Sequence, residues 1–191
     1  GLVSEGLPEA AIQLVPTQDR AAVGGMLTAA GLIDMIVPRG GKSLVARVQA
    51  DARVPVLAHL DGICHTYIHA AADPDKAVRI ALNAKMRRTG ICGAMETLLL
   101  DARFPASQAV VAALIEAGCE LRGDPRAAML DRRILPASAN DWDTEYLDKI
   151  LSVRIVGGLQ DAIDHIRKHS SQHTEAIITE ELDQALQNIK L

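Results

Sequence analysis

The chain has 191 residues, of which 49% are hydrophobic and 23% are charged, so it can bury a core and is not intrinsically disordered. Its net charge is −4 and its basic residues are scattered, which argues against a nucleic-acid partner. No apolar run approaches the roughly 20 residues that cross a bilayer, and no signal-peptide pattern opens the chain, so we expect a cytoplasmic protein without a membrane partner.

The first part of the sequence predicts a helix, a strand and a second helix. Apolar residues recur at helical spacing from Thr17 until Gly31 ends the pattern. The short apolar run 32–37 predicts a strand that is closed by Pro38. The next helix is expected to begin at Lys42, after a pair of glycines.

Two β-rich runs follow, at 54–60 and 63–70, and only Asp61 and Gly62 separate them. Asp-Gly is a strong local turn signal, so one prediction is a hairpin. An α/β sheet would route the two runs differently, and the sequence leaves both arrangements open.

The best marked helix of the chain is expected to begin at Pro74. Asp73 is a residue type that caps helices, and proline suits the first helical turn. The buried stripe of this helix is predicted to comprise Ala77, Val78, Ala81 and Leu82. Its pattern runs down to a basic end and breaks at Gly90.

Strands and helices continue to alternate in the rest of the chain. The predicted elements are a strand at 97–100, a helix at 105–118, a strand from 119, irregular loops at 122–145, a strand at 150–156, a helix at 159–168, a strand at 176–179 and a helix at 182–189. Aromatic residues make up only 2% of the chain, and small aliphatic side chains suit helices packed on a parallel sheet. We therefore predict an α/β fold in which helices flank a parallel-rich sheet.

Of the three cysteines, Cys92 has the surroundings of a nucleophile. It follows a basic helix end and lies in a glycine-flanked turn before a buried strand, and cationic surroundings favour the thiolate that attacks carbonyl carbon. The alternative is a small buried hydrophobe, which suits Cys119 at a strand start. Cys64 is next to His65, but adjacent strand residues face opposite sides, so this pair has poor geometry for catalysis. The odd count argues against a disulfide framework and for a reducing compartment.

Four blocks of the sequence resemble the gamma-glutamyl phosphate reductases, also called glutamate-5-semialdehyde dehydrogenases, within the aldehyde dehydrogenase superfamily. In family order, they are 36–42, 59–65, 89–100 and 173–179. The resemblance implies that Cys92 is the nucleophile. It also implies that 1–37 is the C-terminal part of an NADP-binding domain and 38–191 an incomplete catalytic domain. Because it covers only part of a family chain, we expect this chain alone to be inactive or nearly so.

What the resemblance implies for function is NADPH-dependent reduction of L-glutamate 5-phosphate to L-glutamate 5-semialdehyde through a cysteine thioester, in proline biosynthesis. It further implies a homo-oligomer and functional coupling to glutamate 5-kinase. In hydrolytic aldehyde dehydrogenases a glutamate that activates water begins the block that here starts with Pro38. Proline cannot act as a base, which favours reduction over hydrolysis. The alternatives are another thioester-forming aldehyde dehydrogenase, hydrolytic or CoA-acylating, and a non-catalytic interaction module.

Other polar residues are candidates for binding. By resemblance, Glu145 accepts hydrogen bonds from the nicotinamide ribose, the alternative being a solvated loop charge. Glu96 lies close enough in sequence to Cys92 to contact substrate or tune the thiol, or it is a satisfied strand carboxylate. A basic group is a candidate for holding the leaving phosphate, although cations ordinarily favour a helix C-terminus; it comprises Lys85, Arg87 and Arg88.

Two further patterns favour structural interpretations. Gly40 and Gly41 precede a helix start, where free N–H groups favour anions, but one glycine pair is a weak signal and favours a tight interdomain turn. His59, Asp61 and His65 are residue types that bind metals. Because a turn intervenes and no further ligand converges, we predict hydrogen-bonded structural residues and no metal site.

Overall fold

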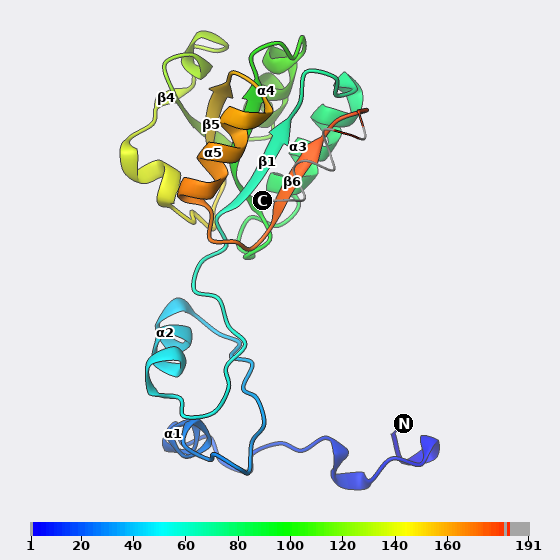
Figure 1. Cartoon of the computed structure of the whole chain (residues 1–191), viewed down its shortest axis with the longest axis vertical. Helices are drawn as coiled ribbons and strands as arrows, with labels where there is room; N and C mark the ends of the chain where they lie inside the picture. Colours follow the sequence, from blue (N-terminus) through cyan, green and yellow to red (C-terminus); the bar gives the residue numbers. More distant parts are fainter. Residues whose placement is uncertain (1, 182, 184–191) are drawn as a thin grey trace. The chain divides into compact units, whose positions relative to one another are not determined.

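The computed structural model describes residues 2–181 and residue 183. The chain divides into two compact units, Gly1–Leu60 and Asp61–Leu191, which are coloured from blue to cyan and from cyan to red in Figure 1. The assignment of 1–37 to a cofactor domain and of 38–191 to a catalytic domain stays a prediction. The helix predicted at 182–189 lies outside the described residues, apart from residue 183.

The first unit is built from short helices. They are the 3-10 helices Leu2–Glu5 and Glu9–Ala11 and the α-helices α1, Ala21–Leu27, and α2, Lys42–Asp51. The start of α2 at Lys42 is confirmed, with Gly41 as its N-cap. Leu27, Val45 and Val48 of these two helices are buried.

The strand predicted at 32–37 is wrong. The described segment forms only isolated bridges, including a parallel one between Ile36 and Val56. The Ile36 N–H donates to the Pro55 carbonyl at 2.9 Å, and the Leu57 N–H donates to the Ile36 carbonyl at 2.9 Å. Pro38 and Pro55 have no N–H to donate, so the bridge does not extend into a ladder.

The second unit contains a sheet of six strands in the order β4-β3-β5-β2-β1-β6. The strands are β1, Cys64–Ile68; β2, Met95–Asp101; β3, Glu120–Gly123; β4, Leu135–Pro136; β5, Ile150–Val156; and β6, Glu175–Ile178. Every pairing between them is parallel. The predicted parallel-rich α/β fold is confirmed, and the bounds predicted for 150–156 match β5.

The hairpin considered between the runs 54–60 and 63–70 is wrong. β1 pairs in parallel with β2 on one side and with β6 on the other, so Asp61 and Gly62 do not form a hairpin turn. All five residues of β1 are buried, the burial pattern of an inner strand in a parallel sheet. Asp-Gly is a local signal, and the tertiary pairing of a buried strand overrides it here.

Helices cover both faces of the sheet, as Figure 1 shows. They are α3, Pro74–Met86; α4, Ser107–Glu116; and α5, Leu159–His169. Leu98 and Leu100 of β2 pack in one core with residues of α3 and α4, whereas Leu99 packs in a second core with residues of α5. This alternation is the period of two that a strand buried on both faces requires.

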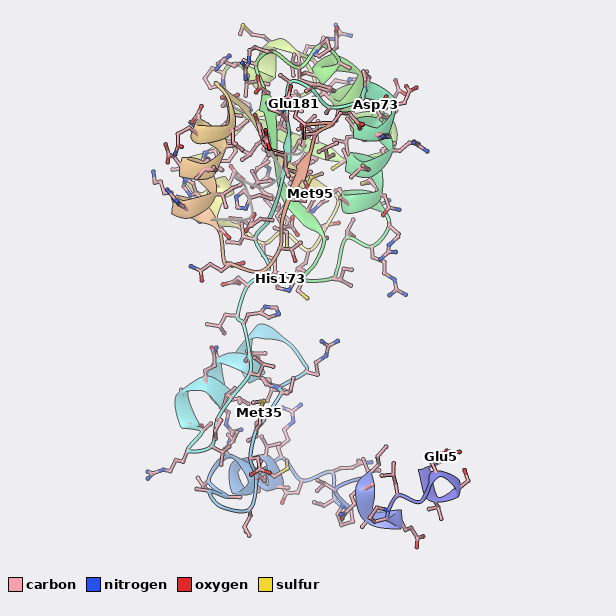
Figure 2. The ribbon with its side chains drawn as sticks, turned by 45° about the vertical axis from the view of Figure 1, so that its right-hand side comes forward. Glu5, Met35, Asp73, Met95, His173 and Glu181 are labelled. Carbon is pink, nitrogen blue, oxygen red and sulfur yellow. The ribbon has the colours of Figure 1, made fainter. Side chains whose placement is uncertain are left out.

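The predicted cap of α3 is confirmed. The Asp73 carboxylate accepts a hydrogen bond of 2.8 Å from the Lys76 N–H, and Pro74 occupies the first turn. Figure 2 labels Asp73 at this helix start. The helix runs from there to Met86 and delivers the chain into the turn that holds Cys92.

The irregular region predicted at 122–145 begins inside β3 and otherwise contains short elements. These are the 3-10 helices Ala127–Met129 and Ala139–Asp143 and the two-residue strand β4. The second 3-10 helix ends at Asp143 and delivers the chain to Glu145 and Tyr146, so it sets where these two residues lie.

Candidate active site

Cys92 lies in the turn between α3 and β2. The Ala94 N–H donates to the Ile91 carbonyl at 2.9 Å, which closes this turn. The Cys92 side chain is partly exposed, whereas Cys64 and Cys119 are buried. Cys92 is therefore the cysteine that a reactant reaches most readily, as the sequence predicts for the nucleophile, although its catalytic role stays a prediction.

The Cys92 turn packs against the segment that enters β1. A Cβ atom placed on Gly62 would lie 2.1 Å from the Cys92 carbonyl oxygen and 2.8 Å from its carbonyl carbon. Only a glycine permits this approach, because such distances are far inside van der Waals contact. The Cys64 thiol also donates to the Cys92 carbonyl at 3.1 Å, so two contacts hold the turn.

His173 is a polar neighbour of Cys92. A nitrogen of its ring lies within 4.8 Å of the Cys92 sulfur, and its Nδ1 lies 3.6 Å from the Cys64 sulfur. Figure 2 labels His173 in the segment that leads into β6, and Met95 at the start of β2. Sequence reasoning used the block 173–179 for its resemblance but gave His173 no role. Only the strand order brings the amino ends of β2, β1 and β6 together.

Glu145 is tied to the same place through Gly62. Its Oε1 accepts a hydrogen bond of 3.0 Å from the Gly62 N–H, and the contact is partly buried. The side chain is thus fixed in position and is not simply a solvated loop charge. Its role toward the nicotinamide ribose stays a prediction.

Glu96 and Lys85 form an ion pair inside the unit. Lys85 Nζ lies 2.6 Å from Glu96 Oε2, and both side chains are 0% exposed. Burial raises the pKa of Glu96, and the contacts with Lys85 oppose that rise. The pair gives both charges a structural partner, whereas Arg87 and Arg88 are exposed at the end of α3. The proposed contacts of Glu96, Arg87 and Arg88 with substrate or phosphate stay predictions.

His65, one of the three residues considered for a metal site, has a structural contact. His65 is buried, and its Nδ1 lies 3.1 Å from Glu175 Oε2. Asp61 and His65 belong to the second unit, and His59 belongs to the first. In the first unit, Gly41 caps α2; the tight turn favoured for Gly40 and Gly41 stays a prediction.

The two buried thiols differ from Cys92 in how they will react. Burial raises the pKa of Cys64 and of Cys119 from 9.0 to about 11, so both stay protonated near neutral pH. We expect iodoacetamide at about pH 8 to modify Cys92 in the folded chain and to leave the other two intact. Peptide mass spectrometry after short exposure measures this, and modification of Cys64 as fast as Cys92 would contradict it.

The same pKa values set a dependence of stability on pH. Both folded-state values lie above the unfolded value of 9.0, so the unfolded chain releases these protons first as the pH rises. The contribution of the two thiols to the free energy of unfolding is fully present below pH 9 and is lost between pH 9 and about 11. Urea unfolding at several pH values in that window follows the loss.

Comparisons with known proteins agree with the fold. The sequence model of the aldehyde dehydrogenase family matches residues 2–132. Gamma-glutamyl phosphate reductase of Novosphingobium aromaticivorans is 68% identical over 97% of this chain and 44% of its own length. The enzyme of the same name from Rhizorhabdus wittichii is 67% identical over 95% of this chain and 42% of its own length.

The crystal structure of a protein with the same name gives a similar result. Gamma-glutamyl phosphate reductase of Thermotoga maritima superposes with a TM-score of 0.88 at 34% identity, covering 96% of this chain and 45% of that one. The chain spans less than half the length of the curated relatives it matches. Among the described residues, none of the helices is both long and apolar enough for a bilayer crossing.

Proposed function

Since the chain belongs to the aldehyde dehydrogenase family, we propose that the protein it comes from reduces L-glutamate 5-phosphate to L-glutamate 5-semialdehyde and phosphate. The observation that carries the proposal is Cys92, partly exposed in its turn, in a chain that is 68% identical to a protein named gamma-glutamyl phosphate reductase. This chain spans less than half the length of that relative, so the activity is proposed for the full-length enzyme.

The proposed chemistry begins at the Cys92 sulfur. Its thiolate attacks the acyl carbon of the substrate, a C–S bond forms, and the C–O bond to phosphate breaks as inorganic phosphate leaves. When bound, NADPH supplies the hydride that reduces the resulting thioester. The tetrahedral adduct on sulfur then collapses to the aldehyde and the free thiolate. The Cys92 backbone N–H is a candidate donor to the oxyanion that develops.

Glu145 is the residue of this chain that we propose for the cofactor. A carboxylate accepts hydrogen bonds from ribose hydroxyls, which have protons to donate. The bond from the Gly62 N–H to Oε1 supports the proposal, because it fixes the side chain without neutralising its charge. The family uses nicotinamide cofactors, and we propose NADP in particular from the resemblance.

Pro38 supports reduction over hydrolysis. A proline side chain cannot accept a proton, so it cannot activate water against the thioester as a glutamate does in hydrolytic relatives. A thioester that water does not reach survives until hydride arrives. From the resemblance alone we further propose a cytoplasmic homo-oligomer that is functionally coupled to glutamate 5-kinase.

The test of this function is the phosphate requirement of the full-length enzyme in the oxidative direction. With L-glutamate 5-semialdehyde and NADP, we expect sustained NADPH formation only when inorganic phosphate is present. Without phosphate the thioester stays on the enzyme, and the absorbance stops rising after about one equivalent per site. Sustained turnover without phosphate would mean hydrolysis, turnover that needs CoA would mean acylation of CoA, and no turnover at all would leave a non-catalytic module.

A further inference from the structure

The Lys85–Glu96 ion pair connects the Cys92 turn to the loop that carries Glu145. Lys85 lies in the last turn of α3, and Glu96 is the second residue of β2, four positions after Cys92. One carboxylate oxygen of Glu96 takes Lys85 at 2.6 Å. The other accepts a hydrogen bond of 3.2 Å from the Leu147 N–H. The hydrogen bond of this second oxygen therefore connects the ion pair to the loop.

Leu147 needs such an anchor. Its φ is 53°, in the left-handed region that a leucine occupies only at a cost. A hydrogen bond from its N–H to an ionised, fully buried acceptor is stronger than one to a neutral group. Burial raises the pKa of Glu96 and the contacts with Lys85 oppose this, so Lys85 helps to keep the acceptor charged.

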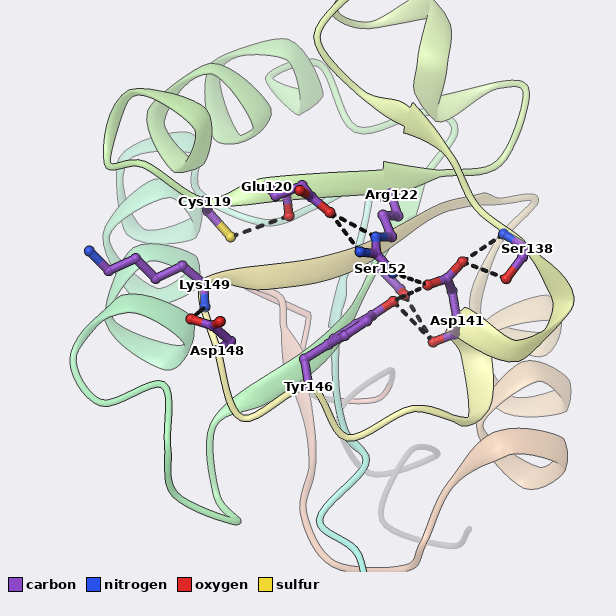
Figure 3. A network of polar contacts seen from close by, with 9 residues as sticks. All are labelled: Cys119, Glu120, Arg122, Ser138, Asp141, Tyr146, Asp148, Lys149 and Ser152. Atoms are coloured by element: carbon purple, nitrogen blue, oxygen red, sulfur yellow. Dashed lines mark hydrogen bonds and ion pairs between the residues drawn. The ribbon is translucent and has the colours of Figure 1, made fainter.

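The neighbouring Tyr146 is held from the other side. Its hydroxyl donates to Asp141 Oδ1 at 2.7 Å and lies 2.8 Å from Ser152 Oγ, a network that Figure 3 shows around the tyrosine. Lys85 Nζ lies 5.9 Å from the centroid of the Tyr146 ring. The loop is thus fixed at two successive residues, and the residue before them is Glu145.

Glu145 connects the loop to the Cys92 turn through Gly62. Its Oε1 accepts from the Gly62 N–H at 3.0 Å, and the Gly62 backbone packs directly on the Cys92 carbonyl. A displacement of the loop would therefore move Glu145, and through Gly62 it would release one support of the Cys92 turn.

We propose that Lys85 and Glu96 form a positioning pair that holds the Glu145 loop and the Cys92 turn in register with each other. Neither residue touches the reacting atoms in this assignment. A buried ion pair does not require such a role for stability, because apolar residues of similar volume often stabilise a core as well or better. What apolar residues cannot supply is the acceptor for the Leu147 N–H. The identity of the ligand that Glu145 receives rests on the proposed function.

Two double variants of the full-length enzyme separate positioning from stability. Both lose the ion pair: Lys85→Met with Glu96→Gln keeps a carbonyl acceptor that can face Leu147, and Lys85→Met with Glu96→Met does not. We expect the Met/Met enzyme to show a KM for NADP at least about 10-fold higher than the Met/Gln enzyme, and a lower kcat, because small misplacements of bound groups are costly in rate. The Met/Gln enzyme should lie between the Met/Met enzyme and wild type in both constants.

A control removes a buried hydrogen bond elsewhere in the same sheet. Tyr67→Phe loses the bond of 2.7 Å to Asp101, at the carboxyl end of β2 and away from Cys92. It should lower the melting temperature and leave the KM for NADP unchanged. Equal kinetic constants in the two double variants, or a KM change as large in Tyr67→Phe, would show that the pair only stabilises the fold.

Two readouts do not depend on reductase turnover. Iodoacetamide modification of Cys92 and fluorescence titration with NADPH are measured on the same proteins without substrate. A wild type that lacks reductase activity but shows different Cys92 alkylation rates in the two double variants would refute the proposed function and support the positioning pair. An active wild type with equal alkylation rates and equal NADPH affinities in both variants would support the proposed function and refute the positioning pair.

A fourth variant covers the case in which the Met/Met protein does not fold. In Glu96→Gln alone, the single carbonyl can face either Lys85 Nζ or the Leu147 N–H, and the charged lysine is the stronger donor. The loop contact is then lost, so the KM for NADP should rise about as in the Met/Met enzyme. An unchanged KM in a folded Glu96→Gln enzyme would overturn the proposal.

Discussion

Replacing Cys92 with serine in the full-length enzyme is expected to lower kcat/KM at least about 1000-fold, which corresponds to about 4 kcal/mol of transition-state stabilisation. A serine hydroxyl is a far weaker nucleophile than a thiolate, because it stays protonated near neutral pH. Steady-state assays in the reductive and oxidative directions measure the loss. The folded state should persist, because the side chain is only partly buried and the substitution is small.

Cys119→Ser is the matched control for this substitution. Cys119 is 4% exposed and its thiol donates to the Glu120 carbonyl at 3.7 Å, as Figure 3 shows. This hydrogen bond is made to the next residue in the sequence, which is not a candidate site residue, so kcat/KM should stay within about 3-fold of wild type while stability falls modestly. If Cys92→Ser retained activity and Cys119→Ser lost it, the nucleophile would be misassigned.

Gly62→Ala is expected to lower kcat/KM about 100-fold or more without touching any group that reacts. The new methyl group would meet three backbone atoms of Cys92, at 2.1 Å from its O, 2.8 Å from its C and 2.9 Å from its Cα. Backbone cannot move aside as a flexible side chain can, so the Cys92 turn must shift by an ångström or more. A misplacement of this size in a catalytic group costs about 100-fold in rate.

Gly157→Ala tests whether the effect belongs to this contact. A Cβ at Gly157 would meet only Asp161 Oδ2 at 3.9 Å, an ordinary contact, and Gly157 follows β5 in the same unit. Activity of Gly157→Ala should stay close to wild type. Circular dichroism and the iodoacetamide rate of Cys92 distinguish a displaced turn from an unfolded protein. A fully active Gly62→Ala enzyme would show that the Gly62–Cys92 contact is not needed for catalysis.

Elements with strong local signals were predictable from the sequence. The Asp73-Pro74 pair marks the start of α3, and the β-branched run 150–156 marks β5. Both signals, the helix cap and the run of strand-forming residues, lie within a few consecutive residues. The run 32–37 and the Asp-Gly turn misled for the opposite reason. Whether an apolar run joins a ladder depends on N–H donors in its partner, and these lie far away in sequence.

The features of the candidate site likewise divide into those that the local sequence predicts and those that depend on the tertiary fold. The partial exposure of Cys92 was predictable, because the glycines that flank it are local in sequence; its catalytic role stays a prediction. The contact with Gly62 and the approach of His173 require that β1, β2 and β6 start side by side, which follows from the strand order and from no single segment. For Glu96 the sequence left open a substrate contact and a satisfied strand carboxylate; the buried ion pair with Lys85 could not be predicted from the sequence, and the substrate contact stays a prediction.

The most direct measurement is to locate the acyl group on the enzyme. The full-length protein is mixed with L-glutamate 5-semialdehyde and NADP without phosphate, quenched in acid, digested and analysed by tandem mass spectrometry. We predict a glutamyl group on the Cys92 peptide that disappears when phosphate is added before the quench. An acyl group on another residue, or an unmodified Cys92 in an enzyme that has formed NADPH, would contradict the assignment of Cys92 as the thioester-forming nucleophile.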